Sequence, residues 1–130
     1  MRTLLPPGWP RPKGYANGIS ARGRLIFTAG VIGWDEQERL VANDLAGQIR
    51  QVLLNMLAIL AEDGAGPEHI VRMTWYLTDR DDYVARAAEI GAIYRELIGK
   101  HYPAIAVVQV AALVEPAALI EIETTAMVPE

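Results

Sequence analysis

The apolar positions of the chain follow two different periods. Apolar residues recur every three to four positions over residues 43–63 and again over residues 81–98, which predicts two amphipathic helices. Apolar and polar residues alternate, or apolar residues run on, over residues 19–20, 24–29, 70–78, 102–113 and 119–126, which predicts strands. The predicted order is β-β-α-β-α-β-β, which belongs to the α+β class.

Capping and turn residues set the predicted boundaries. Asn43-Asp44 suits the start of the first helix, and Gly64 suits its end. The second helix is predicted from Asp81 or Asp82 to Ile98 as one piece. Residues 1–14 hold four of the eight prolines and predict an extended arm anchored by Trp9. The turn at residues 22–23 predicts that the strands on either side of it form a hairpin.

Both predicted helices are apolar on one side only, so each has one face to bury. The simplest arrangement lays both on one face of a single mixed sheet. In the first helix, Gln48, Gln51 and Asn55 are placed off the apolar stripe. The other sheet face would then expose alternate strand residues, many of them apolar, and such a face is rarely left in water. We therefore expect a homo-oligomer with a ligand pocket between subunits.

The last quarter of the chain combines apolar strands with two carboxylates. Residues 102–113 and 119–126 are expected at the centre of the sheet, and Glu121 and Glu123 lie in the second run. A charge in an apolar strand is costly unless it is paired. Two interpretations stay open: both carboxylates are structural and satisfied by backbone or by a neighbouring subunit, or the charges serve catalysis.

Composition excludes several classes of function. The chain has 130 residues, is 52% hydrophobic and is expected to form a single domain over residues 1–130. The net charge is −4 and the basic residues are scattered, so nucleic-acid binding is not expected. Cysteine is absent, no signal-peptide pattern opens the chain, and no apolar run is long enough for a membrane span. These features favour a cytoplasmic protein. His69 and His101 lack metal-ligand spacing, so neither a metal nor a cofactor is expected.

Short motifs along nearly the whole chain make it similar to the RidA/YjgF family, also called endoribonuclease L-PSP. They are, in order, Gly14-Tyr15, Ile-Phe-Thr-Ala-Gly at 26–30, Gln-Val-Leu-Leu-Asn-Met at 51–56, Asp-Gly-Ala at 63–65, Tyr-Pro-Ala at 102–104, Val-Ala-Ala-Leu at 110–113 and Ile-Glu-Ile-Glu-Thr-Thr-Ala at 120–126. The resemblance implies a chorismate-mutase-like fold and a homotrimeric barrel. It also implies small-molecule sites between subunits.

The resemblance further implies hydrolysis of reactive enamines or imines, such as 2-aminoacrylate, to a carbonyl compound and ammonia. On the matching positions, Glu121 is the water-activating carboxylate and Tyr15 is the hydroxyl that closes the pocket. The remaining pocket positions are Gly30, Val31, Trp34, Gly91, Ile105 and Ala106.

Three positions depart from the family pattern. The family's Pro-Ala-Arg is Pro-Ala-Ile here, so Ile105 replaces the arginine that holds a substrate carboxylate. The family's Ser-Gly-Gln is Ala29-Gly30-Val31, and Gly91 stands where an asparagine is common. We therefore expect a substrate preference shifted away from 2-aminoacrylate, or another cation such as Lys13, Arg24 or Arg72 in the pocket. The alternative is a non-catalytic trimer that binds an apolar or aromatic metabolite.

Overall fold

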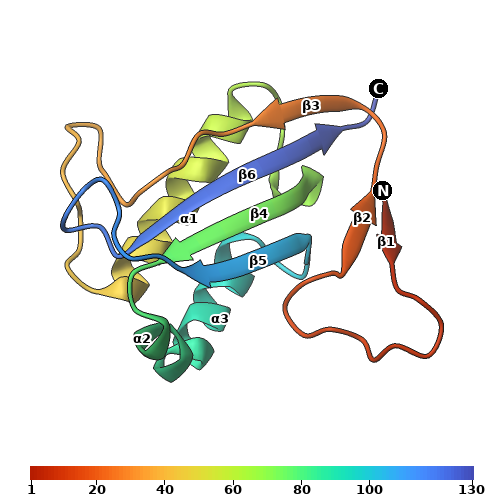
Figure 1. Ribbon diagram of the computed structural model, residues 1–130. Coiled ribbons are helices and arrows are strands. Elements are labelled where there is room, and N and C mark those ends of the chain that lie inside the picture. The colour runs from red at the N-terminus through yellow and green to blue at the C-terminus, as the bar shows by residue number, and fades with distance from the viewer.

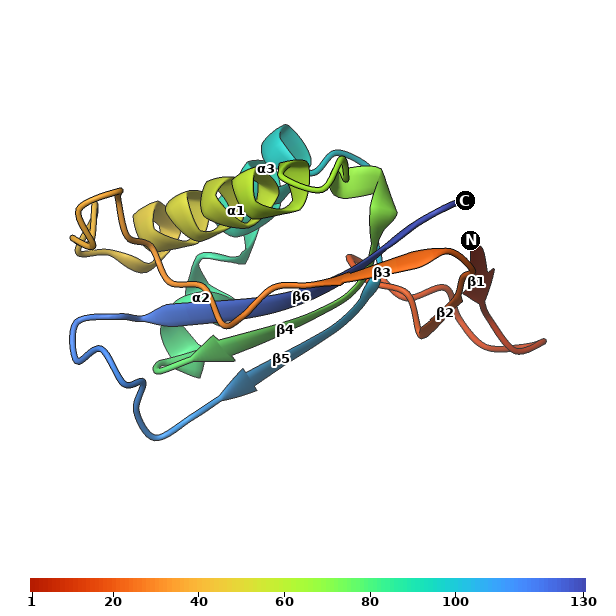
Figure 2. The same ribbon diagram turned by 90° about the horizontal axis from the view of Figure 1, so that it is seen from above.

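A four-stranded mixed sheet with helices on one face forms the body of the protein. The computed structural model describes residues 1–130. The sheet has the strand order β3 (Arg24–Phe27), β6 (Ile120–Val128), β4 (Ile70–Leu77) and β5 (Ala104–Gln109). Helices α1 (Leu45–Ala61) and α3 (Ala87–Leu97) lie side by side over one face, and the short α2 (Arg80–Ala85) lies at the end of β4 (Figures 1 and 2). The predicted α+β architecture is confirmed.

The two C-terminal strands are not neighbours. Strand β6 is central and antiparallel to both β3 and β4, whereas β5 is an edge strand that runs parallel to β4 (Figure 1). The expectation that both strands occupy the sheet centre was therefore wrong for residues 102–113. A parallel strand must return through a crossover, and α2 and α3 provide that crossover between β4 and β5. Only an isolated bridge from Ala16 to Ala104 occupies the outer edge of β5.

The N-terminal arm contains a strand of its own. Strand β1 (Arg2–Leu4) pairs antiparallel with β2 (Gly18–Ser20), so the predicted hairpin between residues 19–20 and 24–29 was wrong. Strand β3 instead pairs with the end of β6. Gly23, between the two strands, has φ +146, and a Cβ there would lie 2.1 Å from the carbonyl oxygen of Val128. Only glycine permits this close approach of the backbone to the C-terminal strand.

Helix α1 carries most of the core. The Asp44 carboxylate accepts a hydrogen bond from the Gly47 amide, which confirms the predicted N-cap. The apolar stripe packs on the sheet, and its fully buried members are Ile49, Val52, Leu53, Met56 and Leu60. Gln48 is also fully buried, contrary to its expected place off the stripe. Its amide donates to the carbonyls of Ala42 and Ala117 and accepts from the Leu119 amide, which satisfies its polar atoms.

The predicted second helix is broken into two. Arg86 separates α2 from α3 with φ −105 and ψ 18, outside the helical range. The chain turns there, and Tyr83 of α2 packs edge-on against Trp75 of β4 with ring centroids 6.4 Å apart. Trp75, in the strand predicted at residues 70–78, is buried in the core. No signal in the apolar period marks this break, because the stripe continues across it.

The open face of the sheet is polar along its central strands. Register places Arg72, Thr74 and Tyr76 of β4 beside Glu121, Glu123 and Thr125 of β6. Exposed apolar side chains occur on the edge strands, with Leu25 and Phe27 on β3 and Val108 on β5. The expectation of a broadly apolar face was thus wrong for its centre. None of the helices has the length and apolar composition that crossing a bilayer requires.

Candidate functional site

Glu121 is half-buried on the open face near the start of β6. It stands opposite Tyr76 in the register with β4. Its carboxylate lies directly over Gly30, where a Cβ would be only 2.1 Å from Oε2. No donor of this chain hydrogen-bonds or ion-pairs with that carboxylate. Both oxygens are thus free to accept a proton or a hydrogen bond from a ligand or water.

Glu121 borders a cavity that we call the acidic cavity. It has a volume of about 680 Å³. Its charged lining residues are all carboxylates, and they are Asp35, Glu36, Glu115 and Glu121. Trp34, Val31 and Ile32 supply apolar wall, and no lysine or arginine lines it. A cavity of this charge favours a cationic or proton-donating group over an anion.

Hydrogen bonds shape the wall of the acidic cavity. The Asn55 amide of α1 donates to the carbonyls of Ile32 and Trp34, at 3.2 and 2.8 Å, and fastens the loop after β3 to the helix. Asp35 Oδ1 accepts from the amides of Gln37 and Arg39, which closes the tip of that loop. The loop around Trp34 is therefore a built wall, and Asn55 has a structural use that the apolar pattern did not predict.

A second cavity, which we call the aromatic cavity, lies between α3, the edge strand β5 and the loop before β2. Its volume is about 320 Å³. Its lining includes five aromatic side chains, Tyr15, Trp75, Tyr83, Tyr94 and Tyr102. The charged residues on it are Lys13 and Arg95, and no carboxylate lines it. Its charge is thus opposite to that of the acidic cavity.

Stacking holds the aromatic cavity in shape. The rings of Tyr94 and Tyr102 stack with centroids 5.7 Å apart. The Tyr94 hydroxyl donates to the His101 carbonyl at 2.6 Å, and burial followed by the proximity of Tyr102 raises the pKa of Tyr94 well above its usual value. Burial likewise raises the pKa of Tyr83. Both phenols are therefore neutral over the physiological pH range.

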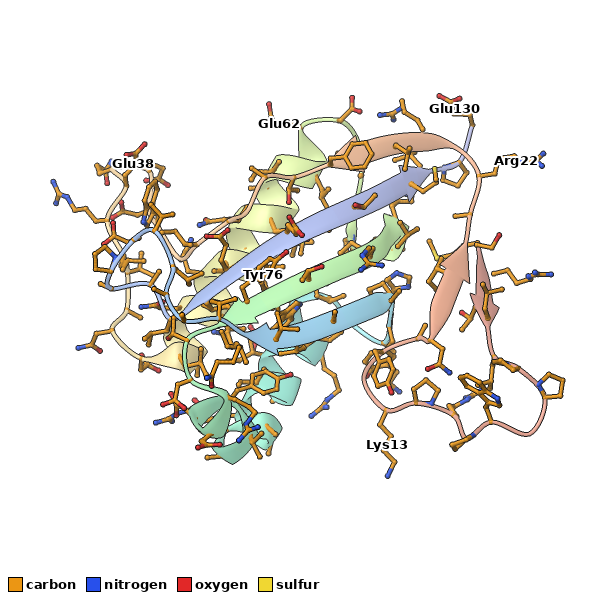
Figure 3. All side chains as sticks on the ribbon, viewed as in Figure 1. Lys13, Arg22, Glu38, Glu62, Tyr76 and Glu130 are labelled. Carbon is orange, nitrogen blue, oxygen red and sulfur yellow. The ribbon has the colours of Figure 1, made fainter.

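The candidate residues from the sequence divide between the two cavities. Glu121, Gly30, Val31 and Trp34 line the acidic cavity, whereas Tyr15, Gly91 and Ile105 line the aromatic cavity. Ala106 lines neither. Figure 3 shows Glu38, at the tip of the loop beyond Trp34, and Lys13 on opposite sides of the fold. One chain alone does not bring the two groups of residues together.

Glu123 has a partner within the chain. It accepts a hydrogen bond of 2.6 Å from the hydroxyl of Tyr76, which Figure 3 labels on β4. This hydrogen bond is the main cause of the raised pKa of Tyr76. A carboxylate already engaged in this way fits the structural interpretation of Glu123, whereas Glu121 has no such partner.

Of the substitute cations named from the sequence, only Lys13 lines a cavity with candidate residues. Arg24 pairs with Asp63, and Arg72 lies on the open face. Arg95 is the cation that sequence reasoning missed. The available signal was its position four residues after Gly91, which places both on one helix face. No group of three histidine or acidic side chains converges as a metal site would.

The class of protein is a small α+β fold with two helices on one face of a mixed sheet. It carries an unpaired carboxylate over a glycine. Residues 10–128 match the family described as Endoribonuclease L-PSP, and the chain belongs to this family. It is 35% identical to the RutC family protein slr0709 of Synechocystis sp., over 99% of this chain and 98% of that protein. It is 33% identical to TdcF of Escherichia coli K12, named a "putative reactive intermediate deaminase", over 98% and 95% of the two chains.

Solved structures show the same fold. A Rid family protein of unknown function, YyfB from Yersinia pestis, aligns with a TM-score of 0.83 and 33% identity over 98% of each chain. RidA from an Antarctic Psychrobacter aligns with a TM-score of 0.71 and 27% identity, over 98% of this chain and all of that one. The RidA/YjgF resemblance and the fold that it implied are confirmed.

Proposed function

We propose that this protein hydrolyses a reactive enamine or imine to a carbonyl compound and ammonia. The observation that carries the proposal is the unpaired Glu121 carboxylate, held over Gly30 at the border of a cavity. The family of the chain and the name of its relative TdcF support the reaction type. The substrate preference is shifted away from 2-aminoacrylate, because Ile105 offers no charge to a carboxylate on the imine carbon.

The complete site is composed of two subunits in a homotrimer. The acidic cavity of one subunit faces the aromatic cavity of its neighbour. Their opposite charges favour this contact. Such a contact also accounts for the division of the candidate residues between the two cavities. The exposed apolar side chains of the two edge strands, such as Phe27 at 68% exposure, also favour burial in an assembly.

The reaction proceeds through one tetrahedral intermediate. An enamine first tautomerises to the imine, which is protonated on nitrogen. Glu121 takes a proton from water while the water oxygen bonds to the imine carbon, which gives a carbinolamine. Protonated Glu121 then returns its proton to the amino nitrogen. The C–N bond breaks, ammonia leaves and the hydroxyl oxygen forms the C=O bond as its proton passes to water. The other carboxylates of the acidic cavity stabilise the cationic imine.

Glu121→Gln tests the role of the carboxylate. We expect the rate of ammonia release from enamines generated in situ to fall by about 10²–10⁴-fold, because a general base contributes that much. Glu123→Gln is the matched control, since Glu123 lies two residues along the same strand and already accepts from Tyr76. Equal rates for wild type and Glu121→Gln would remove Glu121 from the mechanism.

Mixing two inactive variants tests the shared site. Glu121→Gln disables the acidic cavity, and Gly91→Trp fills the aromatic cavity, so neither homotrimer is expected to turn over substrate. Hybrid trimers formed by refolding the two together contain some interfaces with both cavities intact. Recovered activity supports a site between subunits. If mass spectrometry shows that hybrid trimers have formed and they have no activity, the shared site is contradicted.

The alternative is a trimer that binds an aromatic metabolite without turnover. The five aromatic side chains of the aromatic cavity favour it. Saturable binding with no ammonia release from any imine tested would support this second function. Cleavage of RNA, which the description of the family suggests, fits the site poorly. The four carboxylates of the acidic cavity repel phosphate, and the net charge is −4.

A further inference from the structure

Arg95 is an unpaired cation in the wall of the aromatic cavity. It projects from the last turn of α3 and takes part in none of the seven salt bridges of the chain. Its helix neighbours Arg86 and Glu96 are both engaged, with Asp82 and Arg50 respectively. A guanidinium that borders a cavity and has no carboxylate partner is available to an anionic ligand.

Gly91 provides the room that the Arg95 side chain occupies. The two residues are four apart on α3 and therefore share one face of the helix. A Cβ at position 91 would lie 3.3 Å from Nη1 of Arg95, so alanine there would shift the guanidinium only slightly, whereas a larger side chain would compete for its place. Glycine within a helix is unfavourable in itself. Its presence beneath Arg95 is thus consistent with a need to hold the guanidinium against the cavity wall.

The rest of the cavity is suited to a flat or bulky apolar group. Tyr15, Tyr83 and Tyr102 line it from three different segments, and Ile105 lines it from the strand side. Its volume of about 320 Å³ lies at the lower end of the range of small-molecule pockets, roughly 300–1,000 Å³. Trp75 also lines it, and the buried indole N–H of Trp75 has no acceptor in the chain.

We infer that Arg95 is the substrate-anion site, and that the substrate is an imine or enamine carrying a carboxylate on an aromatic or bulky apolar body. The cation comes from the helix wall, and Ile105 makes the strand wall apolar. A carboxylate is therefore bound next to α3, and the apolar body of the substrate lies against Ile105 and the aromatic rings. This inference rests on the proposed function for the reaction, and on Arg95, Gly91 and Ile105 for the ligand.

Binding of a stable probe tests the ligand class without any turnover. The probe is 3-phenylpropanoate, compared with acetate, which has only the charge, and with 3-phenylpropan-1-ol, which has only the body. Isothermal titration calorimetry on the assembled wild-type protein is expected to show binding of 3-phenylpropanoate at least about tenfold tighter than of either fragment. Because one partner is an exposed guanidinium, the affinity should fall as salt rises.

Three variants locate the anion. Arg95→Gln is expected to weaken 3-phenylpropanoate by about tenfold or more and to remove its advantage over the alcohol. Gly91→Leu keeps every charge but fills the space beside the guanidinium, so it should weaken the same probe in the same direction. Arg22→Gln is the matched control, since Arg22 is exposed, takes part in no salt bridge and lines neither cavity. Circular dichroism confirms that each variant is folded.

The outcomes separate this inference from the proposed reaction. If Arg95→Gln and Arg22→Gln bind 3-phenylpropanoate as wild type does, or if wild type does not bind it, the inference is overturned whatever the activity. If Arg95→Gln loses binding but no imine is hydrolysed, the anion site stands and the proposed reaction fails. If Glu121→Gln loses turnover and keeps probe binding, both proposals stand.

Discussion

The acidic and aromatic cavities differ in charge, in lining and in the way the fold builds them. The acidic cavity is bordered by a loop that side-chain amides fasten, whereas the aromatic cavity is walled by stacked rings on helix, strand and loop. Four carboxylates line the first, and a lysine and an arginine line the second. Each would be an incomplete site alone, since the acidic cavity has no cation for an anionic group and the aromatic cavity has no carboxylate to act as a base.

The contrast indicates a division of labour within the proposed shared site. The proposed base, Glu121, lies on the central strand β6. The residues proposed to set substrate preference, Ile105, Gly91 and Arg95, lie on the edge strand β5 and on α3. The predictions that follow, together with the loss of turnover in Glu121→Gln, probe the two cavities separately.

Gln48→Ala should loosen the segment just after Glu115, a residue that lines the acidic cavity. The variant leaves the carbonyls of Ala42 and Ala117 and the amide of Leu119 without the buried side chain that pairs with them. We expect a loss of about 3 kcal/mol in the free energy of unfolding, at roughly 1 kcal/mol for each hydrogen bond. Urea denaturation measures it. Asn55→Ala serves for comparison. It loses two hydrogen bonds to loop carbonyls and one from the Gln51 side chain on the same helix, but Asn55 is only half-buried, so water can replace them and the loss should be smaller. An equal or smaller loss for Gln48→Ala would contradict the assignment.

Ile105→Arg should convert the preference of the aromatic cavity. The new guanidinium supplies charge to a carboxylate on the imine carbon, so activity on 2-aminoacrylate should rise by about tenfold or more over wild type. Ile105→Met keeps size and lacks charge, and it should not raise that activity. Steady-state assays of both variants measure the change. A wild-type rate on 2-aminoacrylate already equal to that of Ile105→Arg would defeat the argument from Ile105.

Tyr94→Phe should lower the free energy of unfolding by about 1 kcal/mol at pH 7, because the hydrogen bond to the His101 carbonyl in the wall of the aromatic cavity is lost. The pKa of Tyr94 is raised in the folded state, so its contribution to stability is fully present below the unfolded value near 10. That contribution is lost as pH rises above 10 toward the folded pKa. Urea melts from pH 7 to 11 should therefore show the gap between wild type and variant narrowing above pH 10. A gap that widens would contradict the sign.

Strong periodicity allowed most of the fold to be predicted from the sequence. The stripe of α1, the Asp44 cap and the alternation around Trp75 all appear as expected. Strand pairing was harder, because short strands carry no sign of their partners. Residues 18–20 pair with residues 2–4 of the arm in three residue pairs, and no side-chain pattern in either segment indicates this pairing. The break at Arg86 was also hidden, since the apolar stripe of the helix runs through it.

The candidate site was predictable only where a family motif names a position. Glu121 and Gly30 do meet in the fold, because the antiparallel bridge between Val31 and Ile122 holds the segment after β3 against β6. Arg95 was missed because its importance depends on Gly91 being empty and on the absence of a nearby carboxylate. Both are facts of three-dimensional neighbourhood, not of composition or period. The polar centre of the open face was not predicted, because the alternation along β4 does not by itself tell which side of the strand the helices cover.

The contact between Glu121 and Gly30 also constrains how such a protein diversifies. A methyl group at position 30 would lie 2.1 Å from Oε2 of Glu121, so Gly30→Ala requires the carboxylate to leave its present position. Because the end of a glutamate side chain can rotate, a substitution at position 30 displaces the proposed base without removing it. Single substitutions at 91 and 95 on α3 and at 105 on β5 leave the contact between Gly30 and Glu121 unchanged. Position 30 is thus constrained by the placement of the base, whereas the three positions around the aromatic cavity can vary without moving it.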